Sequence, residues 1–222
     1  MLKNLSFWAN RIRLHGRLEW LAVLMAWIIW LLVEVVAFAK KDYERYIDVL
    51  GQRALILRSA DKLEWAVRLF EKRLRYSLSK WQEQVSLGEL AVTRAMIGGT
   101  HLGLAIKQAN DALNIAKKHA IGDILIRLLN LAYAYDQADN HRNAWLAYDE
   151  AMALERDLTY QPSSEYHRVK AWWQAAQYQV HIGMLSNARA FYQTASSLAG
   201  KHGFNRHKEE IEKELREINL LP

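Results

Sequence analysis

The chain repeats one pattern of small and large residues, and this repetition constrains its fold more than any other feature. The two clearest units surround Ala144 and Ala188, where small and large residues recur at matching offsets. The first unit contains Leu128, Leu131, Ala132, Tyr135, Ala144, Tyr148 and Ala151, and the second contains Trp172, Ala175, Ala176, Gly183, Ala188, Tyr192 and Ala195. Two fainter copies lie earlier, one with Ala105, Ala109 and Ala112, and one with Ala54, Ala66 and Phe70, in which Arg73 stands where alanine is expected. The sequence therefore predicts stacked helical hairpins.

These offsets resemble the tetratricopeptide repeat (TPR) over about residues 47–200. In that family, a large residue opens helix A, a small one follows four positions later, and an aromatic precedes the turn. Helix B carries small, aromatic and small residues in its core stripe. The resemblance implies an all-α solenoid of antiparallel helix pairs. The marker alanines at 66, 105, 144 and 188 are 39, 39 and 44 residues apart, against about 34 in the family, which indicates longer helices or inserted loops. The alternative is a generic all-α bundle whose Ala and Tyr fill the core.

A second feature is the run from Trp20 to Ala39, WLAVLMAWIIWLLVEVVAFA, with a single charge at Glu34. A helix of twenty residues is about 30 Å long, which matches the hydrocarbon thickness of a bilayer. We therefore predict a single-pass transmembrane helix at 20–39. The alternatives are a buried central helix and a signal peptide cleaved after Ala37-Phe38-Ala39, whose apolar stretch is too long for the usual pattern.

Glu34 is a candidate intramembrane contact, because an ionised carboxylate in hydrocarbon costs about 2.5 kcal/mol or more. In one interpretation it faces a partner helix that carries a donor or a base. In the other it reaches water, headgroups, or Lys40 and Lys41 near the interface. Spacing alone does not decide between them.

The remaining segments divide around this run. Residues 1–19 form a basic segment in which Leu5, Trp8, Ala9 and Ile12 share one helical face, as in a helix lying on a membrane surface. We predict a juxtamembrane helix and first degenerate repeat helix at 40–60, TPR-like repeats at 61–200 and a C-terminal capping helix at 201–222. Ser86 followed by Glu89 has the spacing of a capping box and predicts a helix start there.

Positive charge is concentrated near the apolar run. Residues 1–80 hold fifteen Lys and Arg against eight acids, whereas residues 81–222 hold fifteen against sixteen. The basic segment is suited to anionic headgroups or to an acidic face of another subunit, and the alternative is an ordinary solvated surface. We expect no nucleic-acid partner, because no nucleic-acid motif accompanies the charge.

The sequence predicts no enzyme and no cofactor. It has no cysteine, its eight histidines form no metal-binding spacing, and Gly98-Gly99 is not followed by the Lys and Ser or Thr of a phosphate loop. Binding of other proteins is the function that remains.

The resemblance to TPR proteins implies a concave groove, lined by helix A side chains, that takes a peptide. Carried over by register, the candidate groove residues are Arg94, Tyr133, Gln137, Lys170, Trp173, Gln177 and His181. Their aromatic, amide and basic character suits a peptide with an acidic or carboxyl-terminal element and one apolar anchor. The alternative is that some of them, especially Tyr133 and Trp173, pack against adjacent repeats.

Two functions fit these features. The chain is either a membrane-anchored interaction scaffold or assembly factor, or a constitutive accessory subunit of a large membrane complex. We expect protein partners and membrane lipids in both cases. The short basic leader favours a bacterial inner membrane with the repeats on the periplasmic side, although the basic residues on the two sides of the run nearly balance.

Overall fold

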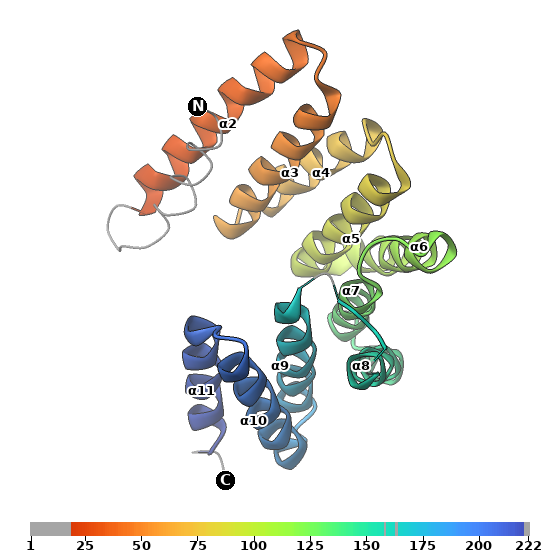
Figure 1. Ribbon diagram of the computed structural model, residues 1–222, viewed down its shortest axis with the longest axis vertical. Helices are drawn as coiled ribbons and strands as arrows, with labels where there is room; N and C mark the ends of the chain where they lie inside the picture. Colours follow the sequence, from red (N-terminus) through yellow and green to blue (C-terminus); the bar gives the residue numbers. More distant parts are fainter. Residues whose placement is uncertain (1–18, 158, 163, 220–222) are drawn as a thin grey trace.

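The computed structural model describes residues 19–157, 159–162 and 164–219, and it is built of helices alone in this part of the chain (Figure 1). The helices are α2 (Glu19–Ala39), α3 (Tyr43–Ser59), α4 (Leu63–Arg75), α5 (Lys80–Ile97), η3 (Gly99–His101), α6 (Leu102–His119), α7 (Ile124–Asp136), α8 (His141–Arg156), α9 (Glu165–His181), α10 (Leu185–Lys201) and α11 (Asn205–Asn219). The predicted amphipathic segment at 1–19 lies almost entirely outside the described residues.

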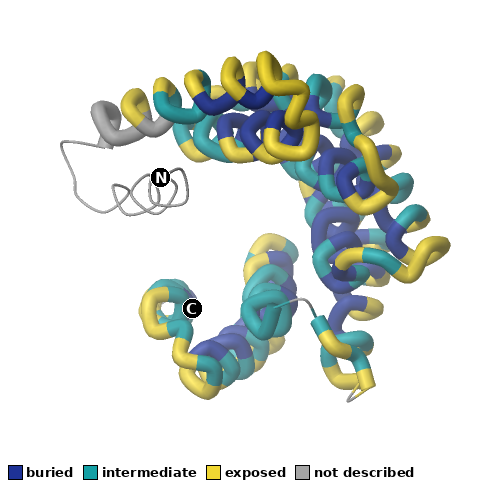
Figure 2. The backbone as a smooth tube through the Cα atoms, turned by 45° about the horizontal axis from the view of Figure 1, so that its top comes forward, coloured by how far each residue is buried: buried dark blue, intermediate teal, exposed yellow. Residues whose placement is uncertain are grey.

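Consecutive helices form four hairpins, α3–α4, α5–α6, α7–α8 and α9–α10, which stack in chain order. The tube in Figure 2 follows an open arc from α2 and α3 at one end to α10 and α11 at the other. α5 contacts α7 and α7 contacts α9, whereas no comparable contacts join α4, α6, α8 and α10 among the described helices. Alternate helices that touch lie on the inner side of such an arc. The all-α solenoid predicted from the repeats is therefore confirmed.

The second helix of each hairpin supplies the small residues that let the helices approach closely. The marker alanines Ala66, Ala105, Ala144 and Ala188 lie in α4, α6, α8 and α10, and each is completely buried. Burial of a small side chain brings two helix backbones together, and larger neighbours then fill the remaining space. The interval between successive marker alanines therefore corresponds to one hairpin.

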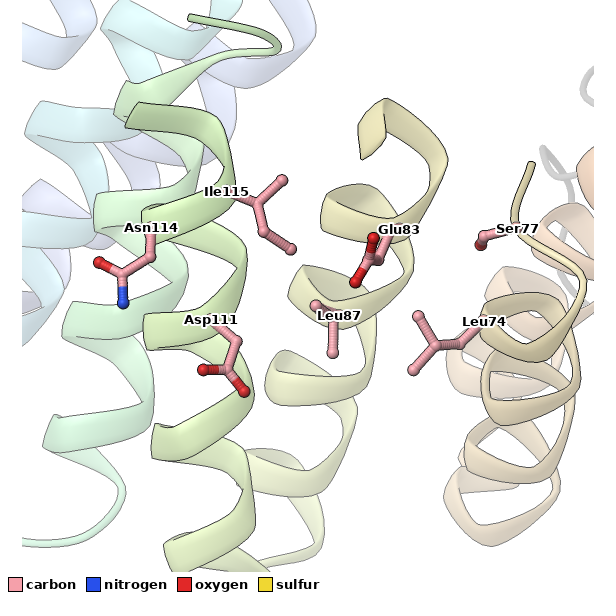
Figure 3. Close-up of a pocket in the computed structure, with 7 residues that line it drawn as sticks. All are labelled: Leu74, Ser77, Glu83, Leu87, Asp111, Asn114 and Ile115. Carbon is pink, nitrogen blue, oxygen red and sulfur yellow. The ribbon is translucent and has the colours of Figure 1, made fainter. Parts of the chain in front are cut away.

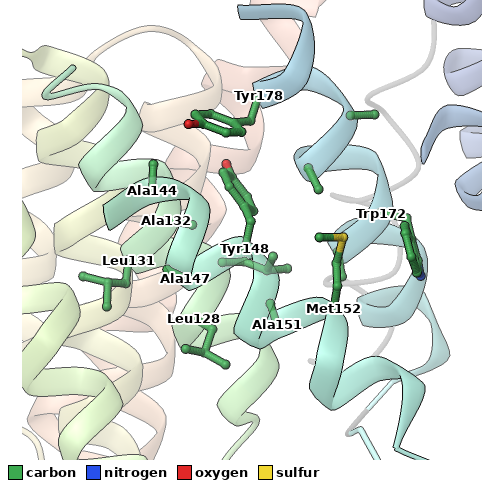
Figure 4. Packing of buried hydrophobic residues seen from close by; sticks show 14 of the residues in the cluster. Leu128, Leu131, Ala132, Ala144, Ala147, Tyr148, Ala151, Met152, Trp172 and Tyr178 are labelled. Atoms are coloured by element: carbon green, nitrogen blue, oxygen red, sulfur yellow. The ribbon is translucent and has the colours of Figure 1, made fainter. Parts of the chain in front are cut away.

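Large side chains complete the core where α7, α8 and α9 meet (Figure 4). Tyr148 of α8 is 2% exposed, and its ring centroid lies 5.2 Å from that of Tyr178 in α9. Met152 and Trp172 lie in the same cluster. Burial raises the pKa of the Tyr148 hydroxyl far above its ordinary value. This core fixes the angle between the third and fourth hairpins.

Side chains that accept hydrogen bonds from the first amide groups cap some of the helices, whereas α4, α6, α7 and α10 have no such cap. Ser79 caps α5 through the amide of Gln82 at 3.2 Å, and Ser164 caps α9 through the amide of Tyr166 at 3.3 Å. The predicted helix start at Ser86 is wrong, because α5 already begins at Lys80. Ser86 is buried inside α5 and donates to the carbonyl of Gln82 at 2.8 Å.

α2 packs on the first hairpin as an additional helix. Ala37 contacts Tyr46 and Leu50 of α3 in a small core cluster. The opposite face of α2 is open, and its exposed apolar residues are Leu24, Met25, Ile28, Leu32, Val35, Val36 and Phe38. Within the described residues, no helix combines the length and the apolar character needed to cross a membrane. The transmembrane helix at 20–39 therefore finds no support in the structure and stays a prediction.

α11 closes the other end of the stack. Its Ile211 and Ile218 are buried, and α11 packs on α10. Charged residues occupy most of its remaining surface, including the ion pair between Arg206 and Glu210 at 3.1 Å. A terminal helix with one apolar and one polar face ends a solenoid in water.

Candidate partner-binding face

We call the first helices of the four hairpins, α3, α5, α7 and α9, the A-helix face. α5 contacts α7 and α7 contacts α9, which places them on the inner side of the arc, and α3 is joined to α5 by the ion pair between Arg58 and Glu89. Side chains from successive repeats therefore converge on it. The buried and partly buried charged side chains described below for this face are mostly positive.

Arg73 reaches the A-helix face from α4. It occupies the core position that holds Ala112, Ala151 and Ala195 in the later repeats, and it is 7% exposed. Gly51 of α3 makes room for it, because a Cβ at Gly51 would lie 3.1 Å from the Arg73 Nε. That Nε has no hydrogen-bond partner among the described residues.

Arg127, near the start of α7, lies across Gly88 of α5 and is 6% exposed. A Cβ at Gly88 would collide with its Nη1, so the glycine is what permits this position. Its Nε and Nη1 also lack hydrogen-bond partners in the described part of the chain. Asn130, one turn later, donates to the carbonyl of Gly88 at 3.4 Å and joins the two helices.

Lys170 of α9 and Arg58 of α3 complete a group of four cations that we call the basic cluster: Arg58, Arg73, Arg127 and Lys170. Burial lowers the pKa of Arg73, Arg127 and Lys170, and the charge of Glu89 in α5 raises all three. Arg127 and Arg58 lower the pKa of Lys170 further. Glu89 is thus the acid at the centre, and its Oε2 accepts from Arg58 Nη1 at 2.7 Å.

A pocket of about 510 Å³ opens beside the cluster between α3 and α5. Arg73 and Glu89 lie in its wall with Asp48 and Gln52. Trp30 and Trp81 add two aromatic rings, and Trp81 is 49% exposed. Arg73 is therefore accessible from an opening whose wall combines charged, amide and aromatic side chains.

A second pocket, of about 470 Å³, lies where α4, α5 and α6 meet (Figure 3). The carboxylates in its wall are those of Glu83 and Asp111, beside Leu74 and Leu87. Glu83 pairs with Lys80 at 2.6 Å. This pocket has no buried cation in its wall and differs in character from the basic cluster.

The structure distributes the seven predicted groove residues among several environments. Lys170 belongs to the basic cluster, and Tyr133 of α7 packs against the main core near Arg58. Arg94 forms an ion pair with Glu71 of α4. Gln137 is exposed at the end of α7. The seven residues thus have different local partners, and the groove that they were predicted to line stays a prediction.

Trp173 and Gln177 face the capping helix. The Trp173 indole Nε1 donates to Glu214 Oε2 of α11 at 3.0 Å, and Gln177 Nε2 donates to the same oxygen at 3.1 Å. Tyr192 of α10 also donates to it at 2.8 Å. Glu214 thus binds three donors from two helices, which fixes α11 in place.

His181 is part of a polar clamp between α7 and α9. Its Nδ1 lies 2.8 Å from Asp136 Oδ1 at the end of α7. At the start of α7, Asp123 lies 2.5 Å from His167 Nδ1 and accepts from the Tyr160 hydroxyl at 2.5 Å. Both ends of α7 are therefore joined to α9 or to the segment before it.

Glu34, the candidate intramembrane contact, has partners inside the chain. It is 8% exposed, forms an ion pair with Arg53 of α3 and accepts from Lys72 Nζ of α4 at 3.0 Å. The Arg53 guanidinium also lies 4.9 Å from the Trp27 ring centroid. Glu34 is therefore paired with two bases of the chain's own repeats, and an intramembrane contact with a partner helix stays a prediction.

No group of three His, Asp or Glu residues that could hold a metal ion occurs among the residues described here. The chain has no cysteine to add to such a group.

Comparison with known proteins identifies the fold. No family model and no curated protein matches the sequence. Among solved structures, a Rap protein complexed with competence and sporulation factor has a TM-score of 0.65 at 16% identity over 79% of this chain, which spans about half (48%) of the Rap protein. A putative kinesin light chain of Podospora anserina with nearly identical TPR-like repeats has a TM-score of 0.63 at 16% identity, covering 90% of this chain and 96% of that one. A tetratricopeptide repeat protein from Parabacteroides merdae has a TM-score of 0.54 at 13% identity, covering 99% and 86%.

These similarities show a TPR-like helical repeat fold. The resemblance read from Ala144 and Ala188 is confirmed at the level of the fold.

Sequence reasoning placed only Lys170 of the basic cluster among the groove residues and missed Arg58, Arg73 and Arg127 as site residues. Arg73 had a signal, since it replaces alanine in the helix B pattern. Arg127 had none, because its position across Gly88 depends on contact between residues 39 positions apart. Only the folded chain brings these charges together.

Proposed function

We propose that the chain is a membrane-attached scaffold or assembly factor that binds a protein partner through the A-helix face. The observation that carries this proposal is the A-helix face, on which α5 contacts α7, α7 contacts α9, and Arg58 of α3 pairs with Glu89 of α5. A solenoid exposes such a face over several repeats and so offers a long surface to a partner. The Rap protein of similar fold is complexed with competence and sporulation factor, which supports the same use of the fold here.

Membrane attachment rests on residues 20–39 and on the open side of α2. Leu32, Val35 and Met25 are 62%, 59% and 55% exposed on that side. Apolar patches of this kind mark contact with lipid or protein. The proposal keeps the location predicted from the sequence, a bacterial inner membrane with the repeats on the periplasmic side.

The test of partner binding is co-purification of the full chain in mild detergent with two matched variants. Lys170→Ala removes a cation of the A-helix face, and Lys118→Ala removes an exposed cation at the end of α6. We expect a stoichiometric protein partner that is lost with Lys170→Ala and retained with Lys118→Ala. Equal capture by both variants would place the partner elsewhere, and absence of any stoichiometric partner would refute the scaffold function.

The location is tested with a single introduced cysteine, since the chain has none of its own. Lys118→Cys should react with a membrane-impermeant maleimide in intact spheroplasts. Reaction only after the membrane is opened would contradict the periplasmic side.

The open face of α2 favours a second candidate, a constitutive subunit of a membrane complex. A neighbouring subunit would cover Leu32 and Val35 and so remove their exposed apolar surface from water. In that case Leu32→Gln should release the co-purifying membrane proteins, whereas Lys170→Ala should not. The reverse pattern supports the scaffold.

A further inference from the structure

Four buried arginines on or beside the A-helix face, Arg53, Arg73, Arg94 and Arg127, have guanidinium nitrogens without hydrogen-bond partners in the described residues. Arg53 and Arg94 each form an ion pair there, whereas Arg73 and Arg127 do not. Arg73 and Arg127 are 7% and 6% exposed, and three of their guanidinium nitrogens find no hydrogen-bond acceptor in the described residues. Buried polar groups are nearly always hydrogen-bonded, and an unpaired buried charge costs several kcal/mol. A cost of this size in a repeat protein calls for an explanation outside the core.

The chain accommodates these arginines with glycines. Gly51 and Gly88 each lie under one guanidinium, and a Cβ at either position would meet the arginine side chain. Glycine inside a helix destabilises it by about 0.5–1 kcal/mol relative to alanine. α3 and α5 therefore each carry a glycine, which destabilises a helix, at the point where an arginine side chain lies across them.

The charges around these arginines do not balance. Arg58, Arg73, Arg127 and Lys170 are close enough to Glu89 for its charge to act on the last three, while Glu89 bonds directly to Arg58. Asp48 and Asp123 act on one arginine each from the edges. Asp123 already serves Tyr160 and His167. The centre of the cluster thus keeps an excess of positive charge.

We propose that the basic cluster is a binding site for an anionic group, a carboxylate or a phosphoryl group on a peptide segment of the partner. This inference rests on the proposed function and specifies which part of the A-helix face the partner occupies. Guanidinium groups bind carboxylate and phosphate through paired N–H donors, and such charge-assisted hydrogen bonds are among the strongest in proteins. The 510 Å³ pocket beside Arg73 admits the group, and its Trp81 ring offers apolar contact to the flanking residues.

The test measures binding of fluorescent decapeptides to the full chain by anisotropy at 150 mM salt. The probes are a decaglutamate, a decaglutamine of equal length, and a decaglutamine carrying one phosphoserine. We expect the decaglutamate or the phosphopeptide to bind and the decaglutamine not to bind. Tighter binding of the phosphopeptide identifies a phosphoryl group, and tighter binding of decaglutamate identifies carboxylates.

Two variants separate the site from general attraction to a basic protein. Gly88→Ala leaves every charge in place but displaces the Arg127 guanidinium, and it should weaken binding at least tenfold. Gly103→Ala in α6 is the matched control, because a Cβ there meets nothing within 4 Å, and it should leave binding unchanged. Arg127→Met should weaken binding as much as Gly88→Ala, with unchanged helicity by circular dichroism.

Failure of this inference is distinguishable from failure of the proposed function. If neither anionic peptide binds, or if both bind Gly88→Ala and Arg127→Met as tightly as the unaltered chain, the anion site is refuted. Co-purification that is lost with Lys170→Ala alone would then still support the scaffold. If the peptides bind as expected but no protein partner co-purifies, the anion site stands and the scaffold is refuted.

Discussion

Replacement of Glu34 by glutamine tests how α2 is held against the repeats. The Glu34 carboxylate is 8% exposed and contacts Arg53 and Lys72. Glu34→Gln leaves the Arg53 guanidinium, 6% exposed, without an anion, and burial already lowers its pKa. Removing one partner of a buried ion pair costs about 3–5 kcal/mol. We expect about 3 kcal/mol, because glutamine still accepts a hydrogen bond and the Lys72 side chain is exposed enough to turn to water.

The assay is hydrogen exchange of the full chain in mild detergent. Because α2 packs chiefly on α3, the loss should appear as local opening of α2. A change of about 3 kcal/mol corresponds to roughly a hundredfold faster exchange of the amides in 27–39, at about 1.4 kcal/mol for each factor of ten. The amides of α7 and α8 should not change, because each repeat contacts only its neighbours.

Two further variants define the cause. Glu44→Gln removes an exposed carboxylate in the first turn of α3 and should leave exchange in α2 nearly unchanged. The double variant Glu34→Met with Arg53→Met removes both charges and should restore most of the protection, as apolar replacement of a buried pair often does. Unchanged exchange in Glu34→Gln would refute the reasoning and would show that the ion pair does not hold α2 in place.

Three other predictions concern charge in the core and on the A-helix face. Arg73→Met should raise the midpoint of thermal unfolding, because an apolar side chain of similar length replaces an unpaired buried charge with a gain of about 1–3 kcal/mol. It should also weaken decaglutamate binding. A lower midpoint in calorimetry would show that Arg73 stabilises the fold. Tyr148 has a folded pKa raised above its unfolded value of 10.0, so its contribution to stability is complete below pH 10 and is lost as the pH rises towards the folded pKa. Above pH 10 the free energy of unfolding should therefore fall less steeply in Tyr148→Phe, by up to about 1.4 kcal/mol per pH unit. Urea denaturation at several pH values measures this difference. Burial lowers the pKa of Lys170 below its ordinary 10.5. Decaglutamate affinity should therefore be full below this lowered pKa and fall as the pH rises through it. Lys170→Arg should move the fall in affinity to higher pH, and a fall at the same pH would assign it to another group.

The hairpins were predictable from the repeat pattern, because the pattern depends on residues that lie close together in the sequence and recur at regular intervals. Ala144 and Ala188 recur with aromatic residues four positions later, Tyr148 and Tyr192, and this spacing places small and large side chains on one helical face. The same reasoning failed at Ser86, where a capping-box spacing occurs inside α5. A capping pair is a short signal, and here it lies within an apolar stripe that continues through it. α5 begins at Lys80, with Ser79 as its N-cap.

The candidate site was less predictable, since its contacts join residues far apart in the chain. Trp173 and Gln177 have helix A register, yet Glu214 of α11 binds both of them 37 or more positions away. Register alone does not reveal that the capping helix covers this part of α9. Lys170, one turn before Trp173, instead points into the basic cluster. A single helix face is therefore divided between structural and candidate binding residues.

Arg73 shows how a departure from the repeat can mark a site. In the later repeats alanine at this position lets two helices approach, and there the core is closed. At Arg73 the helices still approach, because Gly51 provides the missing space, while the guanidinium carries a charge through the first repeat towards the A-helix face. A substitution that served packing alone would need neither the charge nor the glycine. Guanidinium nitrogens of Arg73 and Arg127 have no hydrogen-bond partner in the described chain, and the proposed anion is the partner that would bind them.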